Sequence, residues 1–322
     1  MSVKNKSFLV SDNDVFLDVN LTVSESKRLI AKGIINMPLV KDKLQKGMII
    51  ITKGSTNSYI AEELMKKTIE HGSFLLGHFI PAGKEALNIK KNHIKEIVFE
   101  NGKLIDISYS EALRLLKPGD LVLKGGNLLN YSRKQAAVCI GAYDGGTTHK
   151  FLPYVGENKA KLVIPIGLEK ETSLNLEDSE NVLNANNERL GSIPKLYLFK
   201  TGMIFTEIEA IQQYANVKVF LYGLGGLSGR EGGISFIVVG TKEEIIKVKS
   251  FIKLKGVTTI DRFDSELTIG SVVGIKKIAD FTSSRADTSP EKRVELHCHT
   301  KMSEMDGVSD AKALIMRAFE WG

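Results

Sequence analysis

The chain has 322 residues, of which 43% are hydrophobic and 25% charged, and a formal net charge of +6 at pH 7. This composition excludes an intrinsically disordered protein and predicts two or three domains. Two cysteines make no disulfide framework, and no apolar run approaches the roughly 18 residues that span a bilayer, so we expect a cytoplasmic protein without a membrane partner.

Residues 1–173 alternate helix and strand patterns, which predict a Rossmann-like α/β domain. Thr22-Val-Ser-Glu25 is a capping box that opens a helix, and Pro38 begins a second helix that ends at Gly47. The apolar run at 48–52 predicts a strand buried on both faces, followed by a helix over 58–69. Further strands are expected at 74–80, 94–99, 103–107, 121–123 and 162–166, with a hairpin turn at Asn101-Gly102 and a helix opened by Ser110.

The polar, asparagine-rich stretch 174–193 predicts a linker, and a second domain is expected over 194–256. Its strands are predicted at 195–199, 217–222 and 234–239, and its helices at 206–215 and 241–254. The two helices each follow a capping sequence, at Thr206 and at Thr241. The order β-α-β-β-α predicts a ferredoxin-like α+β domain.

Two short glycine loops each follow a predicted buried strand. The first stands between a strand and a helix, where backbone N–H groups and hydroxyls can hold a phosphate or carboxylate. The second carries a lysine that can pair with the same small anionic ligand if the two strands are neighbours in a parallel sheet. The alternatives are an ordinary helix cap and a tight turn. The candidate anion-binding residues are Lys53, Gly54, Ser55, Thr56, Lys124, Gly125 and Gly126.

Two other loops are rich in functional groups. In Asp144-Gly-Gly-Thr-Thr-His149 the terminal residues can form an acid/base pair, although the same composition is common in turns. The glycine-dense stretch 223–233 lies between two predicted strands. It is either a mobile loop that closes over a ligand through Arg230 or a plain flexible hairpin.

Near the C-terminus, His297 and His299 are separated by one residue. In a strand, this spacing places both imidazoles on one face, which begins a site for a divalent metal such as zinc or manganese. Asp306 can add a carboxylate after a turn. The alternative is two surface histidines without a metal.

The surrounding residues carry a family resemblance. Glu291-Lys-Arg-Val-Glu-Leu-His-Cys-His-Thr-Lys-Met-Ser-Glu-Met-Asp-Gly307 resembles the first metal motif of the PHP domain in PolC-type bacterial DNA polymerase III alpha subunits. The resemblance covers residues 259–322, and we assign 257–322 to a lead-in and a PHP start. It implies that His297, His299 and Asp306 are metal ligands in a domain associated with 3′-5′ exonuclease or phosphoesterase chemistry.

The later PHP motifs and the polymerase domains have no counterpart in this sequence. We therefore expect an incomplete, inactive PHP segment, no DNA synthesis, and DNA as a partner only of a complete polymerase. The chain is expected to be a fused or truncated replication protein whose body binds a phosphorylated or carboxylated small molecule.

Residues 20–255 carry a different resemblance. A Gly-Ser-Thr loop, a later Lys-Gly-Gly and a ferredoxin-like pattern resemble the ribose-5-phosphate isomerase and CoA-transferase-like fold. The chain lacks that isomerase's acidic motif at 107–112 and a carboxylate near Arg133-Lys134, where the general base would fall. The alternative function is therefore a stand-alone isomerase-like or CoA-transferase-like enzyme or binding module with an adventitious polymerase-derived tail. Because neither resemblance explains the other, a junction near residue 257 is predicted.

Overall fold

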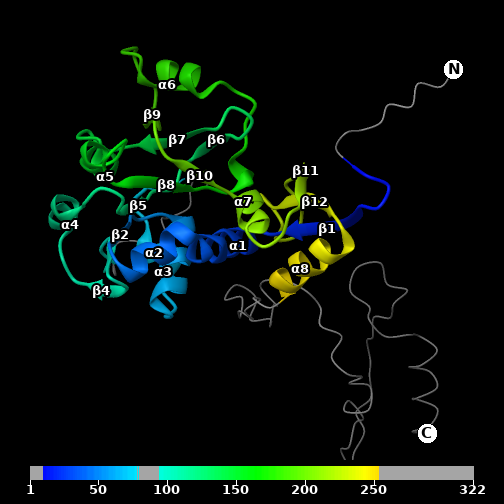
Figure 1. The fold of residues 1–322 in the computed structure, drawn as a ribbon. Helices are drawn as coiled ribbons and strands as arrows, with labels where there is room; N and C mark the ends of the chain where they lie inside the picture. The colour runs from blue at the N-terminus through cyan, green and yellow to red at the C-terminus, as the bar shows by residue number, and fades with distance from the viewer. Residues whose placement is uncertain (1–9, 78, 80–93, 254–322) are drawn as a thin grey trace, which may run out of the picture. The chain divides into compact units, whose positions relative to one another are not determined.

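The computed structural model describes residues 10–77, 79 and 94–253, all of which belong to one compact unit (Figure 1). The helices are α1 (Val23–Asn36), α2 (Pro38–Gln45), α3 (Ser55–Met65), α4 (Tyr109–Leu115), α5 (Gly146–Phe151), α6 (Leu176–Asn184), α7 (Glu207–Gln212) and α8 (Lys242–Lys253), with short 3-10 turns η1 (His71–Phe74), η2 (Leu152–Tyr154) and η3 (Leu168–Lys170). The strands are β1 (Val15–Leu21), β2 (Met48–Ile51), β3 (Ile97–Glu100), β4 (Lys103–Ile105), β5 (Leu121–Leu123), β6 (Leu128–Asn130), β7 (Gln135–Ile140), β8 (Lys161–Pro165), β9 (Lys195–Leu198), β10 (Met203–Phe205), β11 (Lys218–Leu224) and β12 (Ile234–Gly240).

The central sheet has six strands in the order β10-β8-β5-β2-β3-β4. The first four run parallel to one another, while β3 is antiparallel to β2 and to β4. All four residues of β2 are buried, as expected for a strand covered on both faces. The described residues therefore form an α/β protein around a mixed sheet.

Local sequence signals set several element boundaries. Asn101 and Gly102 have φ of 49° and 75°, the left-handed geometry that a tight primed turn needs between β3 and β4. The predicted capping boxes begin α1 at Thr22 and α7 at Thr206, each with the reciprocal pair of hydrogen bonds. The predicted hairpin and both capping boxes are confirmed.

A three-stranded sheet, in the order β6-β7-β9, packs on the central core through Leu129, Ala136 and Val138. On its other face, Ala137, Leu196 and Leu198 pack with Leu176 of α6. Residues 176–184, within the predicted linker, therefore form a helix. Asn175 begins that helix by accepting a hydrogen bond from the Glu177 N–H.

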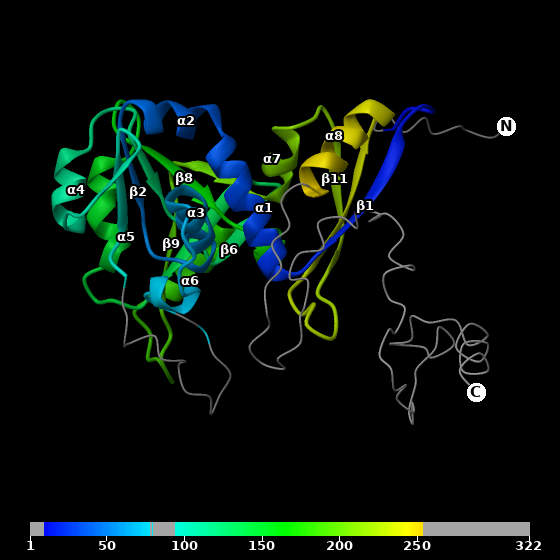
Figure 2. The ribbon, with the colours of Figure 1, turned by 90° about the horizontal axis from the view of Figure 1, so that it is seen from below.

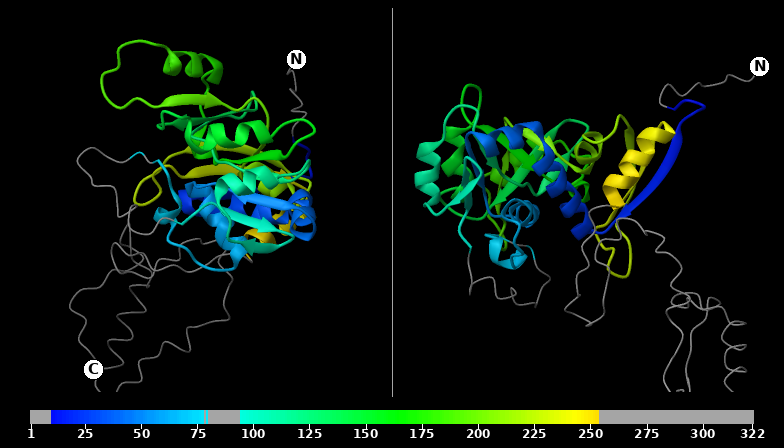
Figure 3. Two further views of the ribbon diagram at one scale, coloured as in Figure 1. Left: turned by 90° about the vertical axis from the view of Figure 1, so that its left-hand side faces the viewer. Right: turned by 60° about the horizontal axis from the view of Figure 1, so that its bottom comes forward.

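The strand at 195–198, β9, does not join β11 and β12 in one sheet as we expected. It pairs with β7, whereas β12 pairs with β1 on one side and with β11 on the other, in the order β1-β12-β11. Strands from the two predicted domains thus share sheets. Helix α8 packs against β1 and β12 (Figure 3, right), and α1 lies on the same side of this sheet as α8 (Figure 2).

The strand predicted at 74–80 is not present among its described residues. Phe74 instead ends the 3-10 turn η1 and is fully buried. The Gly54 N–H donates to the Phe74 carbonyl over 2.9 Å, which ties η1 to the loop after β2. The region 257–322, with the predicted PHP segment, lies outside the described residues.

Candidate functional site

Four loops meet at one edge of the central sheet. Because β2, β5, β8 and β10 run parallel, the segments that follow them all leave the sheet at the carboxyl ends of the strands. The chain from β2 continues to β3 on one side, whereas the chain from β5 continues toward β8 on the other. The carboxyl ends of β2 and β5 therefore form a topological switch point, the kind of place where open α/β sheets bind ligands.

The first glycine loop forms the N-terminus of α3, three residues earlier than predicted. Gly54 is the N-cap, and no side chain caps the helix. The Asn57 amide donates to the carbonyls of Thr52 and Leu123, over 2.8 and 3.0 Å, so it joins the ends of β2 and β5. The helix N-terminus is thereby fixed beside the second glycine loop.

Two polar atoms near this N-terminus are buried without a hydrogen-bond partner: Thr56 Oγ1 and Asn57 Oδ1. A buried polar atom without a partner costs roughly 1–3 kcal/mol. Together with the N-terminal N–H groups of α3, these atoms leave unused hydrogen-bonding capacity at the start of the helix. Lys53 and Ser55 at the loop are half-buried.

Lys124 directly follows β5 and is only 8% exposed. Burial lowers the pKa of its ammonium group to about 8, against the opposing effect of Glu96. Its backbone N–H donates to the Val163 carbonyl over 3.0 Å, which continues the pairing of β5 with β8. Lys124 is therefore a buried lysine, at the same sheet edge as the α3 N-terminus.

The glycines of the second loop have a packing role. A Cβ on Gly126 would lie 2.9 Å from Ile166 Cδ1 and 3.0 Å from the Ala137 carbonyl. A Cβ on Gly125 would lie 3.4 Å from the Pro165 carbonyl. The close approach of Ala137 and Ile166 thus explains why position 126 is a glycine, and this explanation needs no ligand.

The other two predicted loops have structural hydrogen bonds. Asp144 accepts from the Gly146 N–H over 2.9 Å at the start of α5, while the His149 ring lies against Gly145 and edge-on to Tyr197. Arg230 donates to Asn20 Oδ1 over 2.9 Å and holds the β11–β12 loop on the sheet. These contacts favour the turn and hairpin interpretations.

A buried carboxylate at the same edge was not predicted. Glu207, at the start of α7, is fully buried and accepts from the Ser26 hydroxyl and from the Leu168 N–H. Burial and the nearby Glu169 carboxylate raise the pKa of Glu207 to about 7. Lys170 Nζ lies 3.6 Å from Glu169 Oε1.

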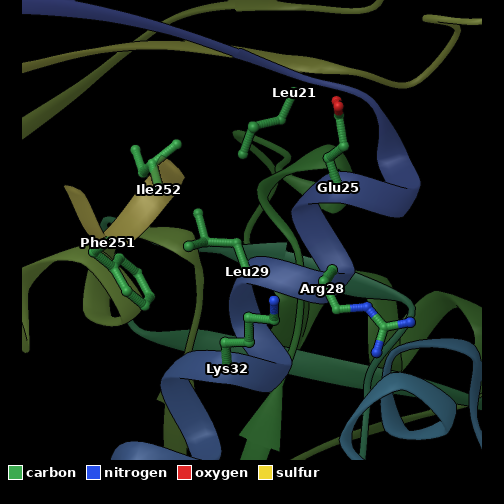
Figure 4. Close-up of a pocket in the computed structure, with 7 residues that line it drawn as sticks. All are labelled: Leu21, Glu25, Arg28, Leu29, Lys32, Phe251 and Ile252. Carbon is green, nitrogen blue, oxygen red and sulfur yellow. The ribbon is translucent and has the colours of Figure 1, made fainter. Parts of the chain in front are cut away.

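A pocket between α1 and α8 contains none of the predicted site residues (Figure 4). Arg28 points away from the apolar residues of the pocket and toward α3, where it pairs with Glu62 and Glu63. Glu25 belongs to the α1 capping box. These two charged groups are therefore already used. The lining residues are Leu21, Glu25, Arg28, Leu29, Lys32, Phe251 and Ile252.

The predicted metal ligands His297, His299 and Asp306 lie outside the described residues. Within the described part, no three His, Cys, Asp or Glu side chains are grouped so that they could hold a metal ion. In that same part, no helix is both long and apolar enough to cross a membrane.

Comparison with known proteins places PolC-type polymerases among the relatives. The DNA polymerase III PolC-type of Caldanaerobacter subterraneus subsp. tengcongensis is 41% identical over 86 residues, 25% of this chain and 6% of that protein. The one of Thermotoga petrophila is 24% identical over 260 residues, 73% of this chain and 17% of that protein. In both cases the chain spans less than a fifth of the relative. No family model and no solved structure matches the chain.

The Thermotoga petrophila match concerns the body of the chain. Residues 257–322 are about a fifth of the chain, so a match over 73% of it must extend well into residues 1–256. The body is therefore itself similar to a PolC-type polymerase, and the junction near residue 257 stays a prediction. The resemblance to the isomerase and CoA-transferase-like fold stays a prediction.

Proposed function

We propose that this chain corresponds to a segment of a PolC-type DNA polymerase III and contributes to DNA replication without performing DNA synthesis itself. The match over 73% of the chain carries this proposal. The finer assignment, a PHP start at 257–322 with a divalent metal at His297, His299 and Asp306, is part of the proposal and is supported by the sequence resemblance. The proposal also includes a Rossmann-like fold and a ferredoxin-like fold for the body of the chain.

A chimera tests this function. The matching part of the Thermotoga petrophila polymerase is replaced by this chain, and primer extension is measured against the unmodified enzyme. We expect primer extension by the chimera, because a homologous segment preserves the fold of its surroundings, and none by the chain alone.

The matched control chimera carries Ile50→Asp, which places an unpaired carboxylate in the fully buried strand β2. This control should lose activity. An unmodified chimera that is soluble but no more active than the control would contradict the proposal.

We also propose that a phosphorylated or carboxylated small molecule binds at the carboxyl ends of β2 and β5. The support is the combination of the uncapped α3 N-terminus, the unpartnered Thr56 hydroxyl and the buried Lys124. An anion there would accept from the helix N–H groups and keep the lysine charged. Each charge-assisted hydrogen bond is worth roughly 1.5–3 kcal/mol.

Thermal-shift titration with inorganic phosphate, sugar phosphates and acyl carboxylates tests this site. Lys124→Met should weaken binding about tenfold or more, and Ser55→Ala should weaken it less, since one neutral hydrogen bond is worth roughly 0.5–1.5 kcal/mol. Wild-type binding should decline as the pH rises above about 8, where Lys124 loses its proton. The control is Lys117→Met, an exposed lysine before β5 at the opposite end of the strand. A flat screen, or equal losses in the two methionine variants, would refute the site.

A further inference from the structure

Three polar residues form a row across the ends of three neighbouring strands in the central sheet. The last residue of β2 pairs with the last residue of β5 and with the first residue of β3. One position beyond these pairs, Thr52 lies between Lys124 and Glu96. Because residues in register point to the same face of a sheet, the lysine and the carboxylate flank the fully buried Thr52 on one face.

The ammonium group of Lys124 has no structural partner. Lys124 is 8% exposed, yet among the described residues its Nζ has neither a hydrogen bond nor an ion pair. Glu96 acts on this group only from a distance, and its attraction is outweighed by burial. Because the resulting pKa is about 8, about a tenth of the molecules carry a neutral amine here at pH 7. Buried lysines are normally paired, so an unpaired one at the ligand-binding end of a sheet points to a ligand group.

We propose that Lys124 is a carbonyl-reactive lysine, which forms an imine with a small phosphorylated or carboxylated aldehyde or ketone bound at the α3 N-terminus. The proposal rests on the anion site proposed above, which holds the phosphate or carboxylate of this ligand beside the lysine. A simple anion uses only the charged form of Lys124. A carbonyl compound also uses the neutral form, whose nitrogen lone pair is a nucleophile.

The reaction is a condensation in which nothing is oxidised or reduced. The Nζ lone pair forms a bond to the carbonyl carbon, and the electrons of the C=O π bond move to the oxygen. Glu96 carries a proton from the nitrogen to that oxygen, which gives a carbinolamine. A second proton follows the same route, water leaves, and the C=N bond forms. Amine and carbonyl thus become imine and water.

Reductive trapping and peptide mass mapping of the full chain test the proposal. The protein is treated with glyceraldehyde 3-phosphate and sodium cyanoborohydride at pH 7, and labelling of Lys124 is compared with that of Lys117, which is exposed at the opposite end of β5. We expect Lys124 to react about tenfold faster or more, because a pKa of about 8 leaves far more neutral amine than the ordinary 10.5 does.

Two matched controls accompany this measurement. Glu96→Gln should slow labelling of Lys124 by about tenfold or more, since it removes the proton acceptor. Glu100→Gln, which changes an exposed carboxylate at the other end of β3, should leave the rate unchanged. Glyceraldehyde, the same aldehyde without the phosphate, should label Lys124 about tenfold more slowly, because it lacks the charged anchor.

Labelling of Lys124 that is no faster than that of Lys117, or that Glu96→Gln does not slow, would overturn the proposal. If the Glu96→Gln chain fails to fold, the pH dependence of the wild type decides: labelling of Lys124 should level off above about pH 8, while labelling of Lys117 keeps rising. Phosphate binding in the thermal-shift titration without labelling would reject only this inference. Equal labelling by both aldehydes would reject the anion site and leave the reactive lysine.

Discussion

At the residue scale, Glu207 is the least expected feature of the molecule. The Thr206 capping box predicts an acidic first turn in α7, and acidic residues there are normally exposed. Glu207 is instead enclosed by Ser26 of α1 and Leu168 after β8. No local pattern indicates this burial, because its partners are distant in sequence.

The raised pKa of Glu207 makes stability depend on pH. Burial and Glu169 raise the pKa to about 7, so the folded state binds a proton more tightly than the unfolded chain does. This contribution to stability is complete below the unfolded pKa, near 4.5, and is lost as the pH rises through about 7. The protein should therefore become less stable between these values on account of this group.

Glu207→Gln tests that dependence. The glutamine oxygen can accept from the Leu168 N–H, and its amide can donate to the Ser26 hydroxyl, so the variant keeps both contacts without a charge. We expect the free energy of unfolding at pH 8 to rise by about 1–3 kcal/mol, with little change at pH 5, measured by urea titration. The control is Glu157→Gln at an exposed position. A loss of stability at pH 8 would show that the carboxylate is favourable there.

At the element scale, the sequence predicts elements whose signal is local. The apolar run of β2, the Asn101-Gly102 turn and the capping residues all act within a few positions, and the structure confirms them. Helix α6 was missed because its composition is polar. Its burial depends on Leu176 and Leu183, seven positions apart, and on a sheet assembled from β6, β7 and β9.

Strand pairing is the part of the fold that the sequence could not supply. The strand at 195–198 has the right pattern and length, but its partner β7 lies about sixty positions earlier and was not recognised as a strand. Similarly, β1 completes the sheet of β11 and β12 from the other end of the described chain. Pairing is decided by tertiary packing, so the order of elements along 194–256 did not show that β1, and not the strand at 195–198, joins the sheet of β11 and β12.

At the scale of the whole molecule, the candidate anion site depends on one feature of topology. The two glycine loops were predicted from residue types, but their convergence required β2 and β5 to be parallel neighbours, which could only be stated as a condition. The pairing of Ile49 with Leu121 and of Ile51 with Leu123 meets that condition. Which of the two loops needs its glycines for packing was not predictable, because that depends on contacts with β7 and β8.

If the body of this chain is related to PolC-type polymerases, the matching part of a PolC-type polymerase has the same fold. A crystal structure of the matching part of the Thermotoga petrophila polymerase decides this question. We expect a central sheet in the order β10-β8-β5-β2-β3-β4, with its four parallel strands and a helix N-terminus following the strand equivalent to β2. A different strand order, or an unrelated fold over the residues that align with 10–253, would contradict it.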